Sequence, residues 1–301
     1  MDRAENSAAL RAATVGQRRA ADAPRTADAP NTFADALSAR YGHPVEPGSL
    51  PIGPVVEAML QHRSVRAYLD RPLPAGTLEL LVAAAQSAAS SSNLQAWSVV
   101  AVEDPDRKAR LSRLANDQAH IRDCPLFLVW IADLSRLDRN AQALGETAAA
   151  NRYLEMFLVA AIDAALAAQN AALAAESMGL GTVYIGAMRN RPEEVAAELG
   201  LPPDAVAVFG LCVGYADPAK LSGVKPRLPQ SVVLHRERYR TEGEREAVAG
   251  YDAAMRAFQA AQKMSDLDWS RRSAARVAGP QSLSGRDRLR EALSALGFGL
   301  A

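Results

Sequence analysis

The sequence is poor in cysteine and in aromatic residues, and it carries no net charge. Its two cysteines, Cys124 and Cys212, stand far apart without CxxC or Cys/His spacing, so it offers no disulfide framework and no zinc site. Its 34 basic residues balance 34 acidic residues, which leaves no overall field to attract nucleic acid or an anionic membrane. Aromatic residues make up only 5% of the chain, which also disfavours nucleic-acid binding.

Long hydrophobic runs are absent as well. The most apolar stretch, Phe157 to Leu180, is interrupted by five polar residues, so it predicts a buried helix rather than a membrane span. The N-terminus lacks the short apolar core of a signal peptide. Together with the unpaired cysteines, these absences favour a protein of the reducing cytoplasm without a membrane partner.

The signatures of several catalytic classes are missing too. The histidines at 43, 62, 120 and 235 are scattered without a carboxylate cluster, so we expect no metal site. No GxSxG motif indicates a Ser-His-Asp hydrolase. Gly179-Leu180-Gly181 lies between a predicted helix and a predicted strand, the wrong order for a dinucleotide-binding GxGxxG turn, and a helix stop explains these glycines.

Composition divides the chain into three regions. Residues 1–48 have almost no large apolar side chain before Phe33, and we expect a disordered N-terminal extension with room for one short helix, Thr32 to Arg40. Residues 49–241 show the pattern of a globular core, and residues 242–301 predict a helical C-terminal extension.

Four strands separated by helices are predicted in the core, which indicates an α/β or α+β sandwich with helices on both faces. The strands are expected at Trp97–Val102, Leu126–Ile131, Thr182–Gly186 and Ala205–Val213. The helices are expected at 54–60, 77–89, 105–114, 141–150, 153–178, 193–199, 244–263 and 286–296.

The long helix over 153–178 is apolar nearly all round, which predicts burial on all its sides. Such a helix could form the core of one domain or be shared between two subunits. We favour a shared helix, because its many alanines allow another backbone to approach closely.

The stretch His62-Arg63-Ser64-Val65-Arg66 combines basic and hydroxyl groups where a helix ends and an irregular segment begins. Guanidinium forks and a hydroxyl suit phosphate oxygens, because each guanidinium can donate two parallel charge-assisted hydrogen bonds. Taken alone, this stretch is weak evidence for a phosphate site, and a solvated basic turn is the favoured explanation.

Taken together and in order, several motifs resemble the flavin-dependent nitroreductase superfamily, in particular its branch of oxygen-insensitive NADPH nitroreductases and flavin reductases. The similarity runs from about Val55 to Tyr251. The motifs are HRSVRAY (62–68), SSSNLQAWS (90–98), NDQAHI (116–121), AAQNAALAAESMGLGTVYIGAMRN (167–190), FGLCVGY (209–215) and KPRLP (225–229).

The resemblance implies an α+β fold, a nitroreductase-like FMN-binding sandwich whose central, mostly antiparallel sheet is flanked by helices. It also implies an intertwined homodimer with one FMN in each of two interface sites. Several positions match cofactor-binding residues of the family. Those that match contacts to the phosphate, ribityl chain and pyrimidine edge are His62, Arg63, Ser64 and Arg66, and the phosphate site is completed by Lys225 and Arg227. Hydrogen bonds to the flavin are implied for Ser90 and Gln118, and one face of the ring is matched by Tyr184, Ile185 and Gly186.

The function that the resemblance implies is FMN-dependent NAD(P)H oxidoreduction, in which hydride passes from nicotinamide to FMN N5 and then to nitroaromatics, quinones or similar small acceptors in a ping-pong cycle. No side chain need serve as nucleophile or general acid, whereas a cation such as Arg66 near N1 and O2 would stabilise the reduced ring. Two alternatives stay open: a flavin reductase that releases free reduced flavin, and a flavin-binding protein without turnover.

The choice between NADPH and NADH also stays open. Relatives bind the 2′-phosphate with arginines in the C-terminal region, where Gln262 and Gly279 stand in this chain. The cations that could substitute are Lys263, Arg271, Arg272 and Arg276.

Overall fold

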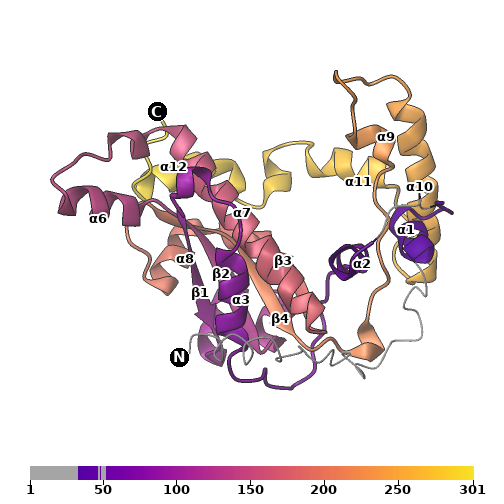
Figure 1. The fold of residues 1–301 in the computed structure, drawn as a ribbon, viewed down its shortest axis with the longest axis horizontal. Coiled ribbons are helices and arrows are strands. Elements are labelled where there is room, and N and C mark those ends of the chain that lie inside the picture. Colours follow the sequence, from indigo (N-terminus) through magenta and orange to yellow (C-terminus); the bar gives the residue numbers. More distant parts are fainter. Residues whose placement is uncertain (1–32, 47, 49–51) are drawn as a thin grey trace, which may run out of the picture.

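A four-stranded antiparallel sheet forms the centre of the molecule. The computed structural model describes residues 33–46, 48 and 52–301 (Figure 1). In spatial order the strands are β1 (Trp97–Val102), β2 (Leu126–Asp133), β4 (Ala205–Gly214) and β3 (Gly181–Ile185). Every pairing is antiparallel. The expected α+β class with an antiparallel sheet is therefore confirmed, and the α/β alternative is set aside.

Helices cover both faces of this sheet and continue beside it. They are α1 (Phe33–Tyr41), α2 (Pro54–Leu60), α3 (Thr77–Gln86), α4 (Pro105–Leu114), α5 (Ala119–Asp123), α6 (Ser135–Ala143), α7 (Leu154–Ser177), α8 (Pro192–Leu199), α9 (Gln230–Val233), α10 (Glu244–Ala261), α11 (Trp269–Arg276) and α12 (Leu289–Ala295).

The core is split between the two faces by the alternation of side chains along β2, all of whose residues are buried. Phe127, Val129 and Ile131 pack with residues of α4, α5 and α8 on one face. Leu128 and Trp130 pack with α3 and α7 on the other. A continuous apolar run is what such a central strand needs, because both of its sides meet helices.

Helix α7 has one alanine-rich face buried against the sheet and α3, and one face outside. The outer face carries Leu154, Leu158, Ile162 and Leu166, which are 44% to 56% exposed. The expectation of burial on all sides is therefore wrong for a single chain, since the sheet reaches only the alanine side. Among the described residues α7 alone is long and apolar enough to cross a membrane, but its alanine face packs as a core helix.

A second group of helices, α1, α2, α9, α10 and α11, lies beside the sheet core, and we call it the outer helical unit (Figure 1). Tyr251 of α10 and Trp269 of α11 meet edge to face, with ring centroids 5.5 Å apart. In the core Trp97 and Trp130 are also 5.5 Å apart. The outer helical unit thus has aromatic packing of its own.

The C-terminus returns to the sheet core and is fastened there by a cluster that we call the C-terminal latch: Asp138, Arg152, Asp204 and residues 297–301. Arg152 forms ion pairs with Asp138 at 3.1 Å and Asp204 at 2.7 Å. It also donates to the carbonyl of Gly297 at 2.6 Å. Backbone hydrogen bonds join Ala301 to Arg152 and Leu154, so the chain end is part of the packed structure.

The strands and most helices lie where the sequence predicts them. The helix expected over 141–150 is wrong: α6 begins at Ser135 and ends at Ala143, and Gly145 follows with a left-handed φ of +71°. A short 3₁₀ turn then occupies 149–152. Helices α5, α9 and α11 are not among the expected helices, since all three are short.

Helix α1 occupies the place of the short helix expected within residues 1–48, and its residues Ala36 and Arg40 are buried. The prediction of disorder for residues 1–32 lies outside the described residues. The division at 48/49 and 241/242 stays a prediction.

Candidate functional site

The segment 62–66 is held against the start of β3. The backbone N–H of Val65 donates to the carbonyl of Thr182 at 2.8 Å, and the Val65 side chain is buried. A Cβ at position 181 would lie 2.6 Å from that side chain, so only glycine fits there. Gly179, with φ +77°, does end α7 as expected, whereas Gly181 has this separate packing role.

This anchoring brings the two basic segments together around one cavity of about 180 Å³, which we call the cationic cavity. Its walls include His62, Arg63, Ser64 and Arg66 from one segment and Lys225 and Arg227 from the other. No Asp or Glu of the described part of the chain lines it. Six of the eleven residues that the sequence assigns to cofactor binding therefore face one space.

The charges around the cationic cavity are not neutralised within it. Desolvation lowers the pKa of Lys225, and the guanidinium groups of Arg66, Arg227 and Arg272 lower it further. Like charges at this spacing disfavour one another until an anion lies between them. A phosphate dianion fits such a donor set, because each cation can give it a charge-assisted hydrogen bond.

Glu176, near the end of α7, orients the imidazole of His62. The His62 Nδ1 donates to Glu176 Oε1 at 2.7 Å, and the hydroxyl of Thr182 donates to the same oxygen at 2.7 Å. This leaves the Nε2 of His62 for other contacts. Sequence reasoning noticed Glu176 only as an interruption of an apolar helix; a lone carboxylate near the end of such a helix is the signal that could have identified it.

Tyr184, Ile185 and Gly186 form the end of β3 and the start of a 3₁₀ turn. Burial raises the pKa of Tyr184, whose hydroxyl donates to Gln169 Oε1 at 3.3 Å. A Cβ on Gly186 would meet the guanidinium group of Arg189 at 3.5 Å. These three residues are not among those lining the cationic cavity, and their assignment to the flavin ring stays a prediction.

Gln118 lies in a tight loop whose preceding residues, Asn116 and Asp117, have φ of +60° and +53°. Its amide Nε2 donates to the carbonyl of Ala115 at 3.0 Å. Two residues on, desolvation and then the charge of Arg66 lower the pKa of His120. Gln118 is not among the residues lining the cationic cavity, and its assignment to the flavin stays a prediction.

Ser90 lies elsewhere, in a loop organised by the buried Asp163 of α7. The Ser90 hydroxyl donates to Asp163 Oδ2 at 2.7 Å, and the same oxygen accepts from the N–H of Ala96 at 3.1 Å. The loop is sharply turned, since Ser92 and Asn93 have positive φ. Within one chain Ser90 does not line the cationic cavity.

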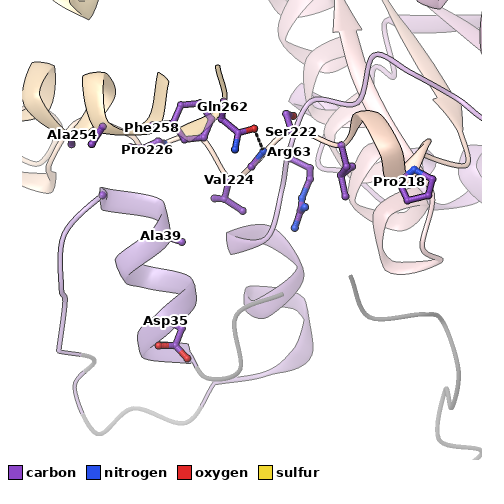
Figure 2. Close-up of a pocket in the computed structure, with 14 residues that line it drawn as sticks. Asp35, Ala39, Arg63, Pro218, Ser222, Val224, Pro226, Ala254, Phe258 and Gln262 are labelled. Atoms are coloured by element: carbon purple, nitrogen blue, oxygen red, sulfur yellow. Dashed lines mark hydrogen bonds between the residues drawn. The ribbon is translucent and has the colours of Figure 1, made fainter. Parts of the chain in front are cut away.

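A larger cavity, of about 760 Å³, adjoins the cationic cavity and shares Arg63, Ser222, Gly223 and Phe258 with it. Figure 2 shows Arg63, Pro218 and Ser222 on one side of it, and α1 with Asp35 and Ala39 on another. Gln262 is engaged in its wall, where Oε1 accepts from the N–H of Gly223 at 2.7 Å.

The four cations that sequence reasoning offered for a second phosphate are not equivalent in the structure. Arg272 acts on the pKa of Lys225, so it lies near the cationic cavity. Arg271 pairs with Asp268 at 3.9 Å, and Arg276 donates to the carbonyl of Ser282. In the described part of the chain, no three His, Cys, Asp or Glu side chains group as metal ligands would.

Two family models match this chain. The family model described as "Nitroreductase family" matches residues 59–215, and the one described as "Nitroreductase family, C-terminal domain" matches residues 225–301. An FMN reductase (NADPH) of Bacillus subtilis is 44% identical over 200 residues, which are 65% of this chain and 80% of that protein. An oxygen-insensitive NADPH nitroreductase of Salmonella typhimurium is 36% identical over 204 residues, 67% of this chain and 80% of the relative.

Among solved structures, an NADPH:FMN oxidoreductase from Vibrio harveyi complexed with NAD+ superposes with a TM-score of 0.73. It shares 33% sequence identity, and the match covers 82% of this chain and 99% of that one.

Proposed function

The chain belongs to the nitroreductase family, and from this membership we propose that its cationic cavity holds the phosphate of FMN. The protein is an FMN-dependent NAD(P)H oxidoreductase. The acceptors that we propose are small and electron-poor, such as nitroaromatics and quinones. The alternative of a flavin-binding protein without turnover is set aside, because the relatives are named as reductases.

The observation that carries the proposal for the site is the convergence of two basic segments on one cavity, to whose lining the described residues contribute no carboxylate. Moving a dianionic phosphate out of water is costly unless several positive groups surround it. Arg63, Arg66, Lys225 and Arg227 would hold the phosphate end, with the Ser64 hydroxyl as a further donor. Glu176 holds the His62 ring in one orientation beside them.

The remaining assigned residues would position the flavin ring. FMN would supply the hydride chemistry, at its N5 atom. The chain's part is to orient the ring through Gln118 and the backbone of Tyr184, Ile185 and Gly186, and to place Arg66 where negative charge grows on reduction. The larger adjoining cavity offers space for the nicotinamide donor and the acceptor in turn (Figure 2).

We propose that the protein works as a homodimer that pairs the outer faces of α7. Leu154, Leu158, Ile162 and Leu166 recur every four residues and form one exposed apolar stripe. Ser90 is held by Asp163 of the same helix, so an interface along α7 would carry Ser90 toward the site of the other subunit. Ile162→Glu should then give a monomer by light scattering, and a dimer of unchanged mass would contradict this interface.

The first test is an absorbance spectrum followed by anaerobic addition of NADPH and NADH in turn. Oxidised-flavin bands that bleach establish the bound cofactor and identify the donor. Bands that persist with both nicotinamides, or a protein that refuses FMN, would overturn the proposal.

A second candidate, a flavin reductase that releases reduced flavin, is favoured by the relative named FMN reductase (NADPH). Steady-state kinetics separate the two roles. Parallel double-reciprocal lines with added FMN as acceptor, and a KM for FMN far below that for quinones, would favour the flavin reductase. Both free thiols, Cys124 and Cys212, are buried and unpaired, which suits the reducing cytoplasm that we propose as its compartment.

A further inference from the structure

Arg40 of α1 lies behind the cationic cavity and bonds to both of its walls. Its side chain is 8% exposed. One terminal nitrogen, Nη2, donates to the carbonyls of Leu60 at 2.6 Å and His62 at 2.9 Å. The other, Nη1, donates to the carbonyl of Lys225 at 3.2 Å. A single guanidinium group therefore joins the backbone that precedes Arg63 to the backbone that carries Lys225.

The end of α1 is fitted against the second wall as well. The N–H of Arg227 donates to the carbonyl of Arg40 at 2.8 Å. Gly42 ends α1 with φ +73°, and a Cβ there would lie 2.9 Å from Ala254 and 3.3 Å from Pro226. Only glycine allows the helix end to approach so closely, so this contact depends on the local sequence.

Burying this guanidinium beside another one has an electrostatic cost. Desolvation lowers the pKa of Arg40 and the charge of Arg227 lowers it further, while Glu176 acts in the opposite direction. An anion in the cationic cavity would offset the repulsion among Arg40, Arg227 and Lys225. The seating of α1 and the binding of a phosphate should therefore favour each other, as coupled equilibria must.

Helix α1 lies before either family match, since those matches begin at residues 59 and 225. We propose that Arg40 is a positioning residue that sets the spacing of the two basic walls and so selects phosphorylated flavin. This inference rests on the proposed FMN site and extends it to a residue outside the matched region.

The test compares the dissociation constants of FMN and riboflavin for the full-length apoprotein, measured by quenching of flavin fluorescence. Arg40→Met should weaken FMN binding by about tenfold, because the hydrogen bonds that align the phosphate-binding groups are lost. Riboflavin, which has no phosphate, should change by less than about twofold. An Arg40→Met protein that keeps the wild-type ratio of the two constants would overturn the inference.

Three further variants sharpen this test. Arg152→Met also removes an arginine that bonds a backbone carbonyl, but in the C-terminal latch, and it should leave the ratio unchanged. Arg40→Lys keeps the charge but donates from a single point, so the FMN preference should stay low. A full return of the preference would overturn the role of Arg40 in spacing the walls.

If Arg40→Met does not fold, Gly42→Val displaces the helix end without touching the guanidinium, and an unchanged ratio of the two constants in that variant would overturn the inference.

A wild-type protein that binds no FMN would refute the proposed function itself. A wild type that binds FMN tightly, beside an Arg40→Met protein that does so equally well, would refute only the role of Arg40.

Discussion

The C-terminal latch and the cationic cavity both gather arginines, but they treat the charge in opposite ways. In the latch Arg152 lies between two carboxylates, and the hydrogen bond that it donates to Asp204 raises the pKa of the guanidinium group. In the cationic cavity no carboxylate from the part of the chain that the structure describes lines the walls, and desolvation and like charges lower the pKa of Lys225.

This difference separates charge that stabilises the fold from charge that awaits a ligand. The latch satisfies its own arginine within the chain, so its contribution is present in the protein alone. The cationic cavity keeps positive groups together at a cost in folding free energy that only a bound anion offsets. A cluster of cations whose cavity lining holds no carboxylate is therefore the better indicator of the binding site.

The largest effect on FMN binding is expected for the double variant Lys225→Met/Arg227→Met. Two charge-assisted contacts are worth about 1.5–3 kcal/mol each, so FMN affinity should fall by roughly 100-fold or more. The apoprotein should be no less stable, because like charges have been removed. Fluorescence titration and thermal unfolding of the same samples check both parts, and a variant that loses stability while keeping FMN would reverse the assignment.

The matched change in the latch is Arg152→Met, which leaves Asp204 and the carbonyl of Gly297 without their donor. We expect a loss of about 2 kcal/mol in the free energy of unfolding, with FMN affinity unchanged. Urea unfolding followed by circular dichroism measures the first quantity, and flavin titration the second. Normal stability together with weakened FMN binding would show that the two regions are not separate.

A smaller effect is expected for Arg66→Ala, which removes one exposed cation from the cationic cavity. FMN affinity should fall by about tenfold. The reduction potential of the bound flavin should also fall, since Arg66 is assigned to the side where negative charge grows. Flavin occupancy equal to that of the wild type would remove Arg66 from the site.

The smallest effect is a dependence on alkaline pH. The folded-state pKa of Lys225 is below its unfolded value. At pH values between the two, the unfolded chain binds more protons than the folded chain, so apoprotein stability should rise with pH up to about 10.5. A bound phosphate favours the charged amine, so FMN affinity should fall over the same window, by roughly threefold.

Lys225→Met should abolish both trends, whereas Lys220→Met, at a lysine outside the cavity lining, should keep them. Titrations between roughly pH 7 and 10 provide the measurement. An affinity that falls equally in both variants would assign the dependence to another group.

The fold was largely predictable because its strands are short apolar runs bounded by turn residues. Trp97–Val102 and Ala205–Gly214 lie within one residue of their predicted bounds. The helix predicted at 141–150 is misplaced because the prediction continues it across Gly145, whose left-handed φ ends the helix there. Burial of α7 could not be predicted, since composition does not tell which face of an apolar helix meets the sheet.

The site was predictable only as a set of basic motifs. The residue types at 62–66 and 225–227 indicate that both segments suit a phosphate, but the sequence cannot show that the two segments face one cavity. The residues that hold them, Arg40 and Glu176, act through hydrogen bonds to other segments of the chain. A lone carboxylate in an apolar helix can mark Glu176, but no local pattern identifies His62 as its partner, because the two residues lie more than 100 positions apart.

The three tryptophans are divided between the two parts of the molecule. Trp97 and Trp130 contact each other in the sheet core, and Trp269 packs on Tyr251 in the outer helical unit. A Trp269→Phe protein would therefore emit only from the core, and a Trp97→Phe/Trp130→Phe protein only from the outer unit. Oxidised flavin absorbs in the range of indole emission, so it can quench tryptophan fluorescence by energy transfer. In the second protein, quenching of Trp269 would therefore report, from the α11 side, the binding of flavin at the wall that contains Lys225, in real time and without an added label.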